Sequence, residues 1–327
     1  MKAYLVKRLL TSLFVLWGVS VLAFSIVRLT PGDPAHTVLP PQATQEQREA
    51  FRESLGLGEP LWDQYLMFLG DIFSGTLGFS VRYNQSVSSL IFERFLATLE
   101  LAVIAVVIAI AISIPAGIIS AIRRDQGADY LATFIALFGV SMPNFWFGIL
   151  LILIFSIRLS IFPVFGYPDY SSVEAVQWLV YHGTLYPLIN FFTHVILPAI
   201  ALGTYMTAVL TRTMRSSMLE EIGVEYIDTA RVKGLPNSTV VLRHTARNAI
   251  LPTITIFGLY FAALLGGSIV IETVFSWPGI GLLVIEAVEM RDYPVVQGII
   301  LFVAVFYVMT NMVVDLLYTV LDPRISY

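Results

Sequence analysis

Apolar residues occur along this chain in long blocks that polar and charged segments separate. A block of about 20 apolar residues can cross the hydrocarbon core of a bilayer as a helix, because each helical residue adds about 1.5 Å. In lipid, a helix also satisfies its own backbone hydrogen bonds. Six blocks pass this length test, and we expect them to be transmembrane helices: Leu9–Val27, Leu99–Ile122, Tyr130–Ile157, His194–Leu210, Ile250–Ile271 and Val295–Val320.

A seventh apolar stretch, Val176 to Phe192, is less regular than the other six. It is interrupted by His182, Gly183 and Pro187, and it also contains Asn190. Glycine and proline are the strongest local breakers of regular structure. We therefore expect this stretch to form a loop at the membrane interface, which leaves six spans and puts both termini on one side.

Basic residues are concentrated on one side of this predicted topology. The opposite short loops contain only Arg158 and Arg291. Short loops rich in lysine and arginine stay in the cytoplasm, so both termini are predicted to be cytoplasmic. The short segments on that side contain Lys2, Lys7, Arg8, Arg123, Arg124, Arg212, Arg215, Arg231, Lys233, Arg243 and Arg247.

The spacing of the predicted helices divides the chain into three parts. Residues 1–28 form the cytoplasmic N-terminus and the first transmembrane helix, and residues 29–96 form a small extracytoplasmic insertion. Within the insertion we expect a turn at Pro31–Pro34 and a short polar helix at Thr44–Leu55. Residues 97–327 form a core of five transmembrane helices, which includes a long cytoplasmic loop at 212–248.

Composition supports a membrane protein and excludes several other classes. The chain has 327 residues, of which 57% are hydrophobic and 13% are charged, against about 25% charged in soluble domains. The net charge of −4 provides no basic domain for nucleic acid. The chain has no cysteine and its four histidines are scattered, so we name no metal ligand. The predicted fold class is an all-α polytopic membrane protein.

Small residues recur every four positions in two of the predicted spans. Helices in lipid associate through close backbone contact across small residues, since lipid tails provide little hydrophobic driving force. We therefore expect these positions to be helix contacts within the chain or between chains. They are Ala105, Ala109, Ser113 and Gly117 in the second span, and Gly258, Ala262 and Gly266 in the fifth.

The predicted loop at 212–248 is long, and loops of this length usually have a function. Ser217 and Glu220 have the spacing of a capping box, which predicts that a helix starts there. Gly234 followed by Leu235 and Pro236 predicts that this helix ends near residue 233. Charges of both signs between these points suit a docking surface, although a solvated connecting hairpin would have the same pattern.

This loop also contains a recognisable motif. Asp228-Thr229-Ala230-Arg231-Val232-Lys233-Gly234, followed by Ile250-Leu251-Pro252, resembles the Glu-Ala-Ala…Gly…Ile-x-Leu-Pro signature of permease subunits in binding-protein-dependent ATP-binding-cassette importers. Asp228 and Thr229 depart from the first two residues of that signature, and the gap from Gly234 to Pro252 is longer than in sugar importers. Both departures resemble the dipeptide and oligopeptide branch of the family.

The resemblance to that branch extends over almost the whole chain, and the later matching segments are longer. The matching segments are Pro31-Gly32-Asp33-Pro34, Thr98-Leu99-Glu100-Leu101, Ser141-Met142-Pro143, Arg215-Ser216-Ser217-Met218, Arg247-Asn248-Ala249-Ile250-Leu251-Pro252, Glu272-Thr273-Val274-Phe275-Ser276-Trp277-Pro278-Gly279, Arg291-Asp292-Tyr293-Pro294-Val295 and Asp322-Pro323-Arg324.

The resemblance implies a type I importer permease in the bacterial inner membrane that imports dipeptides or oligopeptides. Its implied partners are a second homologous permease, two cytoplasmic ATPases and an extracytoplasmic solute-binding protein, with the lipid membrane around them and no nucleic acid. The chain has no phosphate-binding loop motif. ATP and Mg would therefore be bound by the partner subunits, and this chain would be a transport subunit without a cofactor and not an enzyme.

The resemblance also assigns the short loop helix as the coupling helix that receives ATPase motion. Its candidate coupling residues are Glu225, Asp228, Thr229, Ala230, Arg231 and Gly234, of which Ala230 and Gly234 would allow close approach of the ATPase and Gly234 could equally be only a helix cap.

A second group of residues is a candidate for the extracytoplasmic side. Glu272, Trp277, Glu289 and Asp292 could receive the binding protein or the peptide, although an ordinary solvated loop is an equal alternative. The sequence leaves the substrate open among dipeptides, oligopeptides, glutathione and nickel. A secondary transporter is a less favoured alternative because the chain shows no clear inverted repeat. It also contains no zinc-protease or serine-nucleophile motif.

Overall fold

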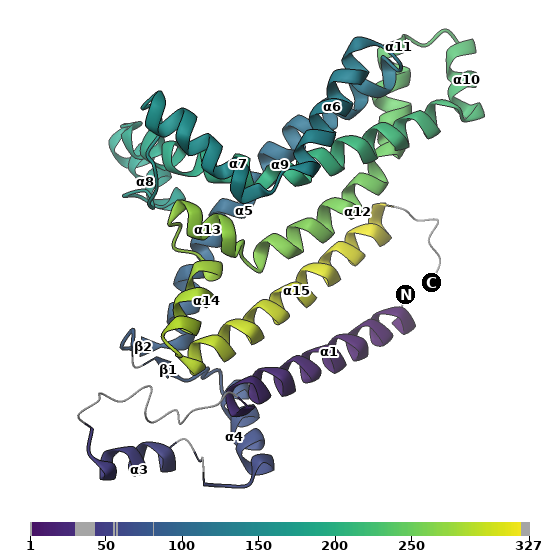
Figure 1. Cartoon of the computed structure of the whole chain (residues 1–327). Coiled ribbons are helices and arrows are strands. Elements are labelled where there is room, and N and C mark those ends of the chain that lie inside the picture. The colour runs from purple at the N-terminus through teal and green to yellow at the C-terminus, as the bar shows by residue number, and fades with distance from the viewer. Residues whose placement is uncertain (1, 30–42, 55, 57, 81, 322–327) are drawn as a thin grey trace.

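The computed structural model describes residues 2–29, 43–54, 56, 58–80 and 82–321, and this part of the chain is almost entirely helical (Figure 1). The turn predicted at Pro31–Pro34 lies outside the described residues. In chain order the elements are α1 Lys2–Leu29, α3 Gln45–Ser54, α4 Leu61–Phe73, β1 Phe79–Ser80, β2 Gln85–Ser86, α5 Val87–Ile122, α6 Gly127–Ser141, α7 Asn144–Leu151, η1 Ile152–Arg158, α8 Ser172–His182, α9 Tyr186–Ile222, α10 Glu225–Val232, α11 Asn237–Thr239, η2 Val240–Thr245, α12 Ala246–Leu265, α13 Ile269–Phe275, α14 Ile280–Glu289 and α15 Tyr293–Leu321.

Several of these helices are long and apolar enough to cross a bilayer. Within the described residues there are five single helices of this kind, and up to seven spans if each of two bent helix pairs counts as one. The five lie in α1, α5, α9, the continuous run from α11 to α12, and α15. Each overlaps one of the six predicted blocks, so the polytopic helical class is confirmed, whereas the count of six spans is not.

The block predicted as one span from Tyr130 to Ile157 is two helices. α6 and the run of α7 with η1 meet at an angle of 105°. Met142 at the break is extended, with ψ of 132°, and Pro143 follows it as the N-cap of α7. Proline disfavours a helical conformation at the preceding residue and cannot donate an intrahelical hydrogen bond. Prolines 115, 198 and 252, in contrast, lie inside continuous helices.

The block predicted from Ile250 to Ile271 is shifted, because its continuous helical run starts earlier, at Asn237, and also ends earlier than expected. α12 ends at Leu265, and Gly267 follows with φ of +87°, a conformation that side chains other than glycine's rarely adopt. α13 and α14 then form a second bent pair with an angle of 88°. Residues 280–289, which were expected in a loop, are therefore helical.

The stretch expected as an interfacial loop, Val176 to Phe192, is mostly helical as well. Ser171 and Glu174 form a capping box that starts α8, and Gly183 with φ of +69° ends it. α9 begins at Tyr186, with Pro187 in its first turn, where the missing N–H of proline has no partner to lose. His182 and Gly183 predicted an interruption of the helix. The structure has this interruption, but only three residues separate α8 from α9.

The centre of the bundle is the contact between α5 and α9. Ala105, Ala109 and Ser113 are completely buried, and α5 and α9 approach so closely that a Cβ atom on Gly117 would lie 2.6 Å from the Met214 Cβ atom. On α9, a Cβ atom on Gly203 would lie 2.8 Å from the Ala105 carbonyl oxygen. Small residues on both helices therefore permit their close approach.

The small residues of the fifth predicted span occupy a second contact. Gly258 and Ala262 are buried, and a Cβ atom on Gly266 would lie 3.2 Å from the side chain of Val303 on α15. Figure 1 shows α12 and α15 side by side, with α1 beside α15. The start of α1, the end of α15 and the segment around α10 all lie toward the right of that view, whereas α8, α13 and α14 lie to the left.

The region predicted as an insertion is described in part. α3 matches the expected polar helix at Thr44–Leu55, and α4 packs on α1 through an edge-to-face contact between Tyr65 and Phe24. β1 and β2 form a short antiparallel hairpin, directly after which α5 begins at Val87. The helix thus starts twelve residues before the predicted position Leu99.

We predict that Gly117→Ala destabilises the protein by about 1–3 kcal/mol, because the added methyl group overpacks the α5–α9 contact. The check is the thermal unfolding midpoint of the purified protein in detergent. Gly18→Ala is the matched control, since a Cβ atom there meets nothing within 4 Å. Equal midpoints for the two variants would contradict the packing argument.

Candidate functional site

The loop between α9 and α12 holds a short helix, α10, as the sequence predicted, but the helix starts later than Ser217. α9 continues without a break to Ile222, and Met218 is completely buried. Ser217 and Glu220 are therefore interior positions of α9 and not a capping box. The chain leaves the helical conformation at Val224, whose ψ is 140°, and α10 begins at Glu225.

Gly234 ends α10 in a left-handed conformation, with φ of +76°. The Gly234 N–H donates to the Arg231 carbonyl at 2.9 Å, and the Leu235 N–H donates to the Ala230 carbonyl at 3.4 Å. This pair of bonds is a Schellman motif, which satisfies the last carbonyls of the helix. A Cβ atom on Gly234 would meet nothing within 4 Å, so glycine is required here by its backbone angle and not by crowding within the chain.

α10 has one face that packs on its own chain. Ile227 is completely buried, Ala230 is 7% exposed, and both contact Val240 at the start of η2. Ala230 was expected to allow close approach of a partner. Its side chain faces inward in this structure, so it supports the position of α10 and does not lie on the open surface.

The opposite face of α10 is open. Glu225, Asp228, Thr229 and Arg231 are exposed, and Arg231 forms an ion pair with Asp228 at 3.1 Å, one turn away. Val232 lies on the same open surface and is 88% exposed. A surface that mixes charges of both signs with exposed apolar side chains suits a contact with another protein better than a contact with lipid.

Tyr226 fixes α10 to the two helices that flank it. Its hydroxyl donates to the Glu221 carboxylate at 2.9 Å and accepts a bond from the Asn248 amide at 2.9 Å, and that amide also donates to Glu221 at 3.1 Å. Partial burial, and then the Glu221 carboxylate, raise the pKa of Tyr226 above its usual value, so the hydroxyl remains a donor at neutral pH. α10 is therefore tied to the end of α9 and to the start of α12.

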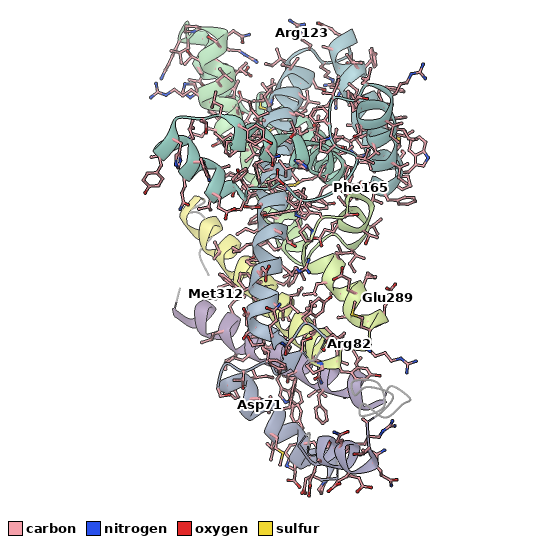
Figure 2. All side chains as sticks on the ribbon, turned by 90° about the vertical axis from the view of Figure 1, so that its left-hand side faces the viewer. Asp71, Arg82, Arg123, Phe165, Glu289 and Met312 are labelled. Carbon is pink, nitrogen blue, oxygen red and sulfur yellow. The ribbon has the colours of Figure 1, made fainter. Side chains whose placement is uncertain are left out.

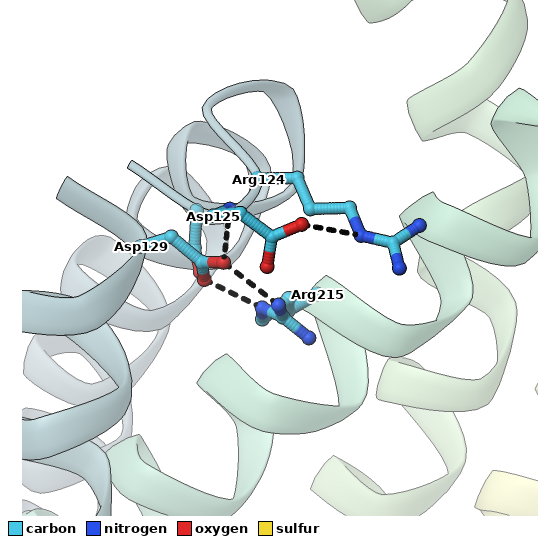
Figure 3. A network of polar contacts seen from close by, with 5 residues as sticks. Arg124, Asp125, Asp129 and Arg215 are labelled. Atoms are coloured by element: carbon cyan, nitrogen blue, oxygen red, sulfur yellow. Dashed lines mark hydrogen bonds and ion pairs between the residues drawn. The ribbon is translucent and has the colours of Figure 1, made fainter. Parts of the chain in front are cut away.

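An ion pair between a buried carboxylate and a partly exposed arginine braces α9 near the same end of the bundle (Figure 3). The Arg215 guanidinium on α9 donates two hydrogen bonds, of 2.7 and 2.8 Å, to the two carboxylate oxygens of Asp129 on α6. The Asp125 N–H donates to the same carboxylate at 3.0 Å, and the Ser120 hydroxyl also donates to it. α5, α6 and α9 are thereby joined just before α9 reaches α10.

The residues proposed for the opposite end are mostly internal. Glu272 and Trp277 are completely buried and Asp292 is 3% exposed, whereas Glu289 is exposed at the edge of α14 (Figure 2). Three of these four side chains therefore face the interior of the chain in this structure. Neither a partner nor a solvated loop explains them, because α13 and α14 fold back onto α5.

The Glu272 carboxylate holds that folded-back hairpin together. It accepts hydrogen bonds from the Leu282 N–H at 2.9 Å, from the Ser268 N–H at 3.2 Å and from the Thr98 hydroxyl at 3.2 Å. The Trp277 indole donates to the Ala97 carbonyl of α5 at 2.8 Å. A buried carboxylate is stable only when it is well paired, and these donors meet that requirement.

Two further carboxylates nearby also accept hydrogen bonds from other parts of the chain. The Asp292 carboxylate accepts a hydrogen bond from Ser80 on β1, and the Glu286 carboxylate accepts one from the Tyr83 hydroxyl at 2.8 Å. Burial, together with Glu286, raises the pKa of Tyr83 to about 12. The hairpin of β1 and β2 is thus attached to α14 and to the start of α15.

Glu100 has a role that sequence reasoning did not assign. Its carboxylate accepts hydrogen bonds from the Tyr167 hydroxyl at 2.6 Å and from the N–H and hydroxyl of Ser172 at 2.8 and 2.6 Å. Burial, and then Glu100, raise the pKa of Tyr167 above its usual value, so its hydroxyl stays protonated. The Glu100 carboxylate attaches the first turn of α8 to α5. A charged residue in an apolar span is energetically costly, and this cost was the sequence signal that Glu100 has a specific role.

Among the described residues, no group of three or more histidine, cysteine, aspartate or glutamate side chains is placed to hold a metal ion. The donors around Glu272 and Asp129 are all groups of the chain itself.

Comparison with known proteins places this architecture in a family. The model described as "Binding-protein-dependent transport system inner membrane component" matches residues 113–327, which include α10 and both bent pairs. The chain belongs to this family. Residues 1–102 match the corresponding model, described as "Binding-prot-dependent transport system membrane comp, N-term".

Similar proteins align over the full chain. A dipeptide transport system permease protein of Alkalihalophilus pseudofirmus is 43% identical, and an oligopeptide transport system permease protein of Bacillus subtilis is 41% identical, each over 100% of both chains. A glutathione transport system permease protein of Escherichia coli is 40% identical over 99% of both chains. The protein is therefore a multi-pass transport subunit of the inner membrane and not an enzyme.

We predict that Asp129 and Arg215 are strongly coupled in stability. Arg215→Gln leaves the buried Asp129 carboxylate without its counterion and costs about 3 kcal/mol, whereas Asp129→Asn leaves a partly exposed Arg215 and costs less; the double variant costs less than the sum. The check is a double-mutant cycle from unfolding in detergent. The pair Arg124–Asp125, with side chains 66% and 71% exposed, is the control and gives at most about 1 kcal/mol. Additive effects at Asp129 and Arg215 would contradict the brace.

Proposed function

We propose that this chain is the transmembrane subunit of an ATP-driven importer that translocates dipeptides or oligopeptides delivered by an extracytoplasmic binding protein. The full-length similarity to dipeptide and oligopeptide permeases supports this substrate class. Similarity to a glutathione permease supports glutathione as a second candidate, and glutathione is itself a small peptide. None of the relatives described above concerns nickel.

The proposed partners are a second homologous permease, two cytoplasmic ATP-binding-cassette ATPases and the binding protein. The chain has no phosphate-binding loop, so ATP and Mg would be bound by the ATPases. In this arrangement residues 1–28 begin in the cytoplasm, residues 29–96 lie largely on the outer side, and the loop at 212–248 faces the ATPases.

The single observation that carries the mechanism is the geometry of α10. Its inner face is packed on Val240, Tyr226 fixes it to α9 and α12, and its outer face is open. A short helix held this firmly transmits a displacement as rigid-body motion and does not absorb it by bending. ATPase closure would then rotate α9 and α12 together and open the path for the substrate.

In this proposal Glu225, Asp228, Thr229 and Arg231 provide the polar contacts of the ATPase interface. Ala230 holds α10 against its own chain, and Gly234 provides the helix end. Glu272, Trp277 and Asp292 set the shape of the outer side from within, whereas Glu289 is exposed and free to meet the binding protein.

The test of the function is ATP hydrolysis and uptake by the complex purified through this chain and reconstituted in liposomes. The cognate binding protein is added with alanyl-alanine, a pentapeptide or glutathione. We expect one of these loaded forms to stimulate hydrolysis severalfold and to be taken up only with ATP. A complex without any co-purifying ATPase would overturn the proposal and favour a secondary transporter.

We predict that Val232→Glu disrupts the contact between α10 and the ATPase and so lowers both stimulated hydrolysis and transport. Val232 is 88% exposed on α10, so the variant folds, but a buried carboxylate in the ATPase interface is costly. Binding-protein-stimulated hydrolysis and peptide uptake should both fall at least about tenfold. Val180→Glu on α8, where the valine is 72% exposed, is the matched control and should keep both activities. Normal stimulation of the Val232 variant would remove the assignment of this face.

A further inference from the structure

The short helix α8 has an exposed side that none of the contacts described so far explains. Its residues fall on neighbouring strips with the spacing i, i+3 and i+7, which a helix brings onto one line. The strip that faces the chain has Ala175 completely buried, with Ser172 and Leu179 half-buried. The Ser172 hydroxyl donates to the Glu100 carboxylate at 2.6 Å, which holds this strip against α5.

Two further strips of α8 face outward, and they differ in chemistry. The apolar strip consists of Val173, Val176 and Val180, which are 62%, 50% and 72% exposed. The polar strip is displaced by one residue, or about 100° around the helix, and consists of Glu174, Gln177 and Tyr181, all exposed. An open apolar strip beside an open polar strip is the pattern of a helix that lies in the boundary between hydrocarbon and water.

The length of α9 places α8 close to that boundary. From Tyr186 to Thr211, α9 contains no lysine, arginine, aspartate or glutamate, and these 26 residues extend over about 39 Å. A bilayer is about 30 Å thick in its hydrocarbon core and about 40–45 Å with its interfacial regions. α8 precedes α9 by three residues, at the end opposite from α10 (Figure 1). It therefore lies at headgroup level, on the side that is extracytoplasmic in the proposed arrangement.

The surface next to α8 is apolar as well. α8 packs on α9, and the first turns of α9 expose Tyr186, Ile189 and Phe192 by 47–63%. Ile189 and Phe192 also line an open apolar groove together with Phe162. Large apolar side chains exposed side by side mark a contact with a membrane or another protein. Because α9 is long and apolar enough to span the bilayer, its exposed outer turns face lipid, and this lipid-facing surface begins six residues after Val180.

The aromatic residues of α8 and of its junction with α9 fit the same location. Trp178, Tyr181 and Tyr186 are 39%, 79% and 63% exposed. Tryptophan and tyrosine are enriched at membrane–water interfaces, because their rings are apolar and each also carries a polar group. A protein partner would not require this series of aromatic residues beside a separate polar strip.

We propose that α8 is an interfacial helix in the outer headgroup region, with its apolar strip in contact with phospholipid acyl chains and its polar strip in water. Because Glu100 attaches α8 to α5, this contact holds α5 at a fixed depth in the bilayer. A carboxylate at headgroup level reaches water, so the Val180→Glu control described above keeps its activity. The proposal depends on membrane insertion and on no particular substrate.

The absence of cysteine from this chain permits a site-specific test. Val176→Cys and Gln177→Cys are each introduced into the complex purified through this chain, with the cysteines of its other subunits replaced. Each variant is labelled with a nitroxide and reconstituted in phosphatidylcholine liposomes. The two positions are adjacent and exposed but lie on different strips. We expect the ratio of relaxation by molecular oxygen, which partitions into hydrocarbon, to relaxation by a water-soluble nickel chelate to be severalfold higher at Val176→Cys.

The other outcomes overturn the proposal in distinguishable ways. Equal ratios at the two positions would show that the strips do not face different solvents. A label at Val176→Cys that neither reagent reaches would place a protein surface on the apolar strip, such as that of the second permease. A label that the nickel chelate reaches until the binding protein is added would assign the strip to the binding protein.

The depth of α8 is the second measurement. A fluorophore on Val176→Cys is exposed to phospholipids that carry a nitroxide quencher either near the headgroup or near the end of the acyl chain. We expect the headgroup-proximal quencher to be the stronger one. Val15→Cys, 45% exposed near the middle of the α1 span, is the control and should show the reverse order. The same order at Val176→Cys as at Val15→Cys would place α8 inside the hydrocarbon core and overturn its interfacial position.

Discussion

The close contact between α5 and α9 is the constraint on which the rest of the structure depends. At Gly117 and at Gly203 the space between the helices is smaller than a Cβ atom requires. Lipid provides little hydrophobic driving force for helix association, so the stabilisation has to come from this close packing. Because α9 is one unbroken helix of 37 residues, the same contact orients both its outer end and the end that leads to α10.

Polar side chains then join the neighbouring helices to one another at each end of α9. At one end the Asp129–Arg215 pair and the Tyr226 network make α6, α9, α10 and the start of α12 a single unit. At the other end Glu100 and Glu272 attach α8 and the α13–α14 hairpin to α5. A displacement of α10 would therefore move α6, α9 and the start of α12 with it as one rigid unit. At the other end, α8 and the α13–α14 hairpin stay firmly attached to α5.

Block length predicted the membrane class, and the stop at Gly234, Leu235 and Pro236 predicted the short helix before it, because both signals depend on local chemistry. Local chemistry could not show which prolines break a helix. Pro143 ends one because its preceding residue has left the helical conformation, whereas Pro115 and Pro198 lie in helices that packing preserves. The capping pattern at Ser217 was overridden in the same way, since Met218 beside it is buried in the core.

The position of the charged residues could be predicted only in part for a related reason. Sequence shows that a carboxylate is present but not whether backbone donors will surround it, and for Glu272 those donors come from residues 268 and 282 as well as from α5. Once such internal pairs are recognised, a charged residue no longer indicates a ligand by its presence alone.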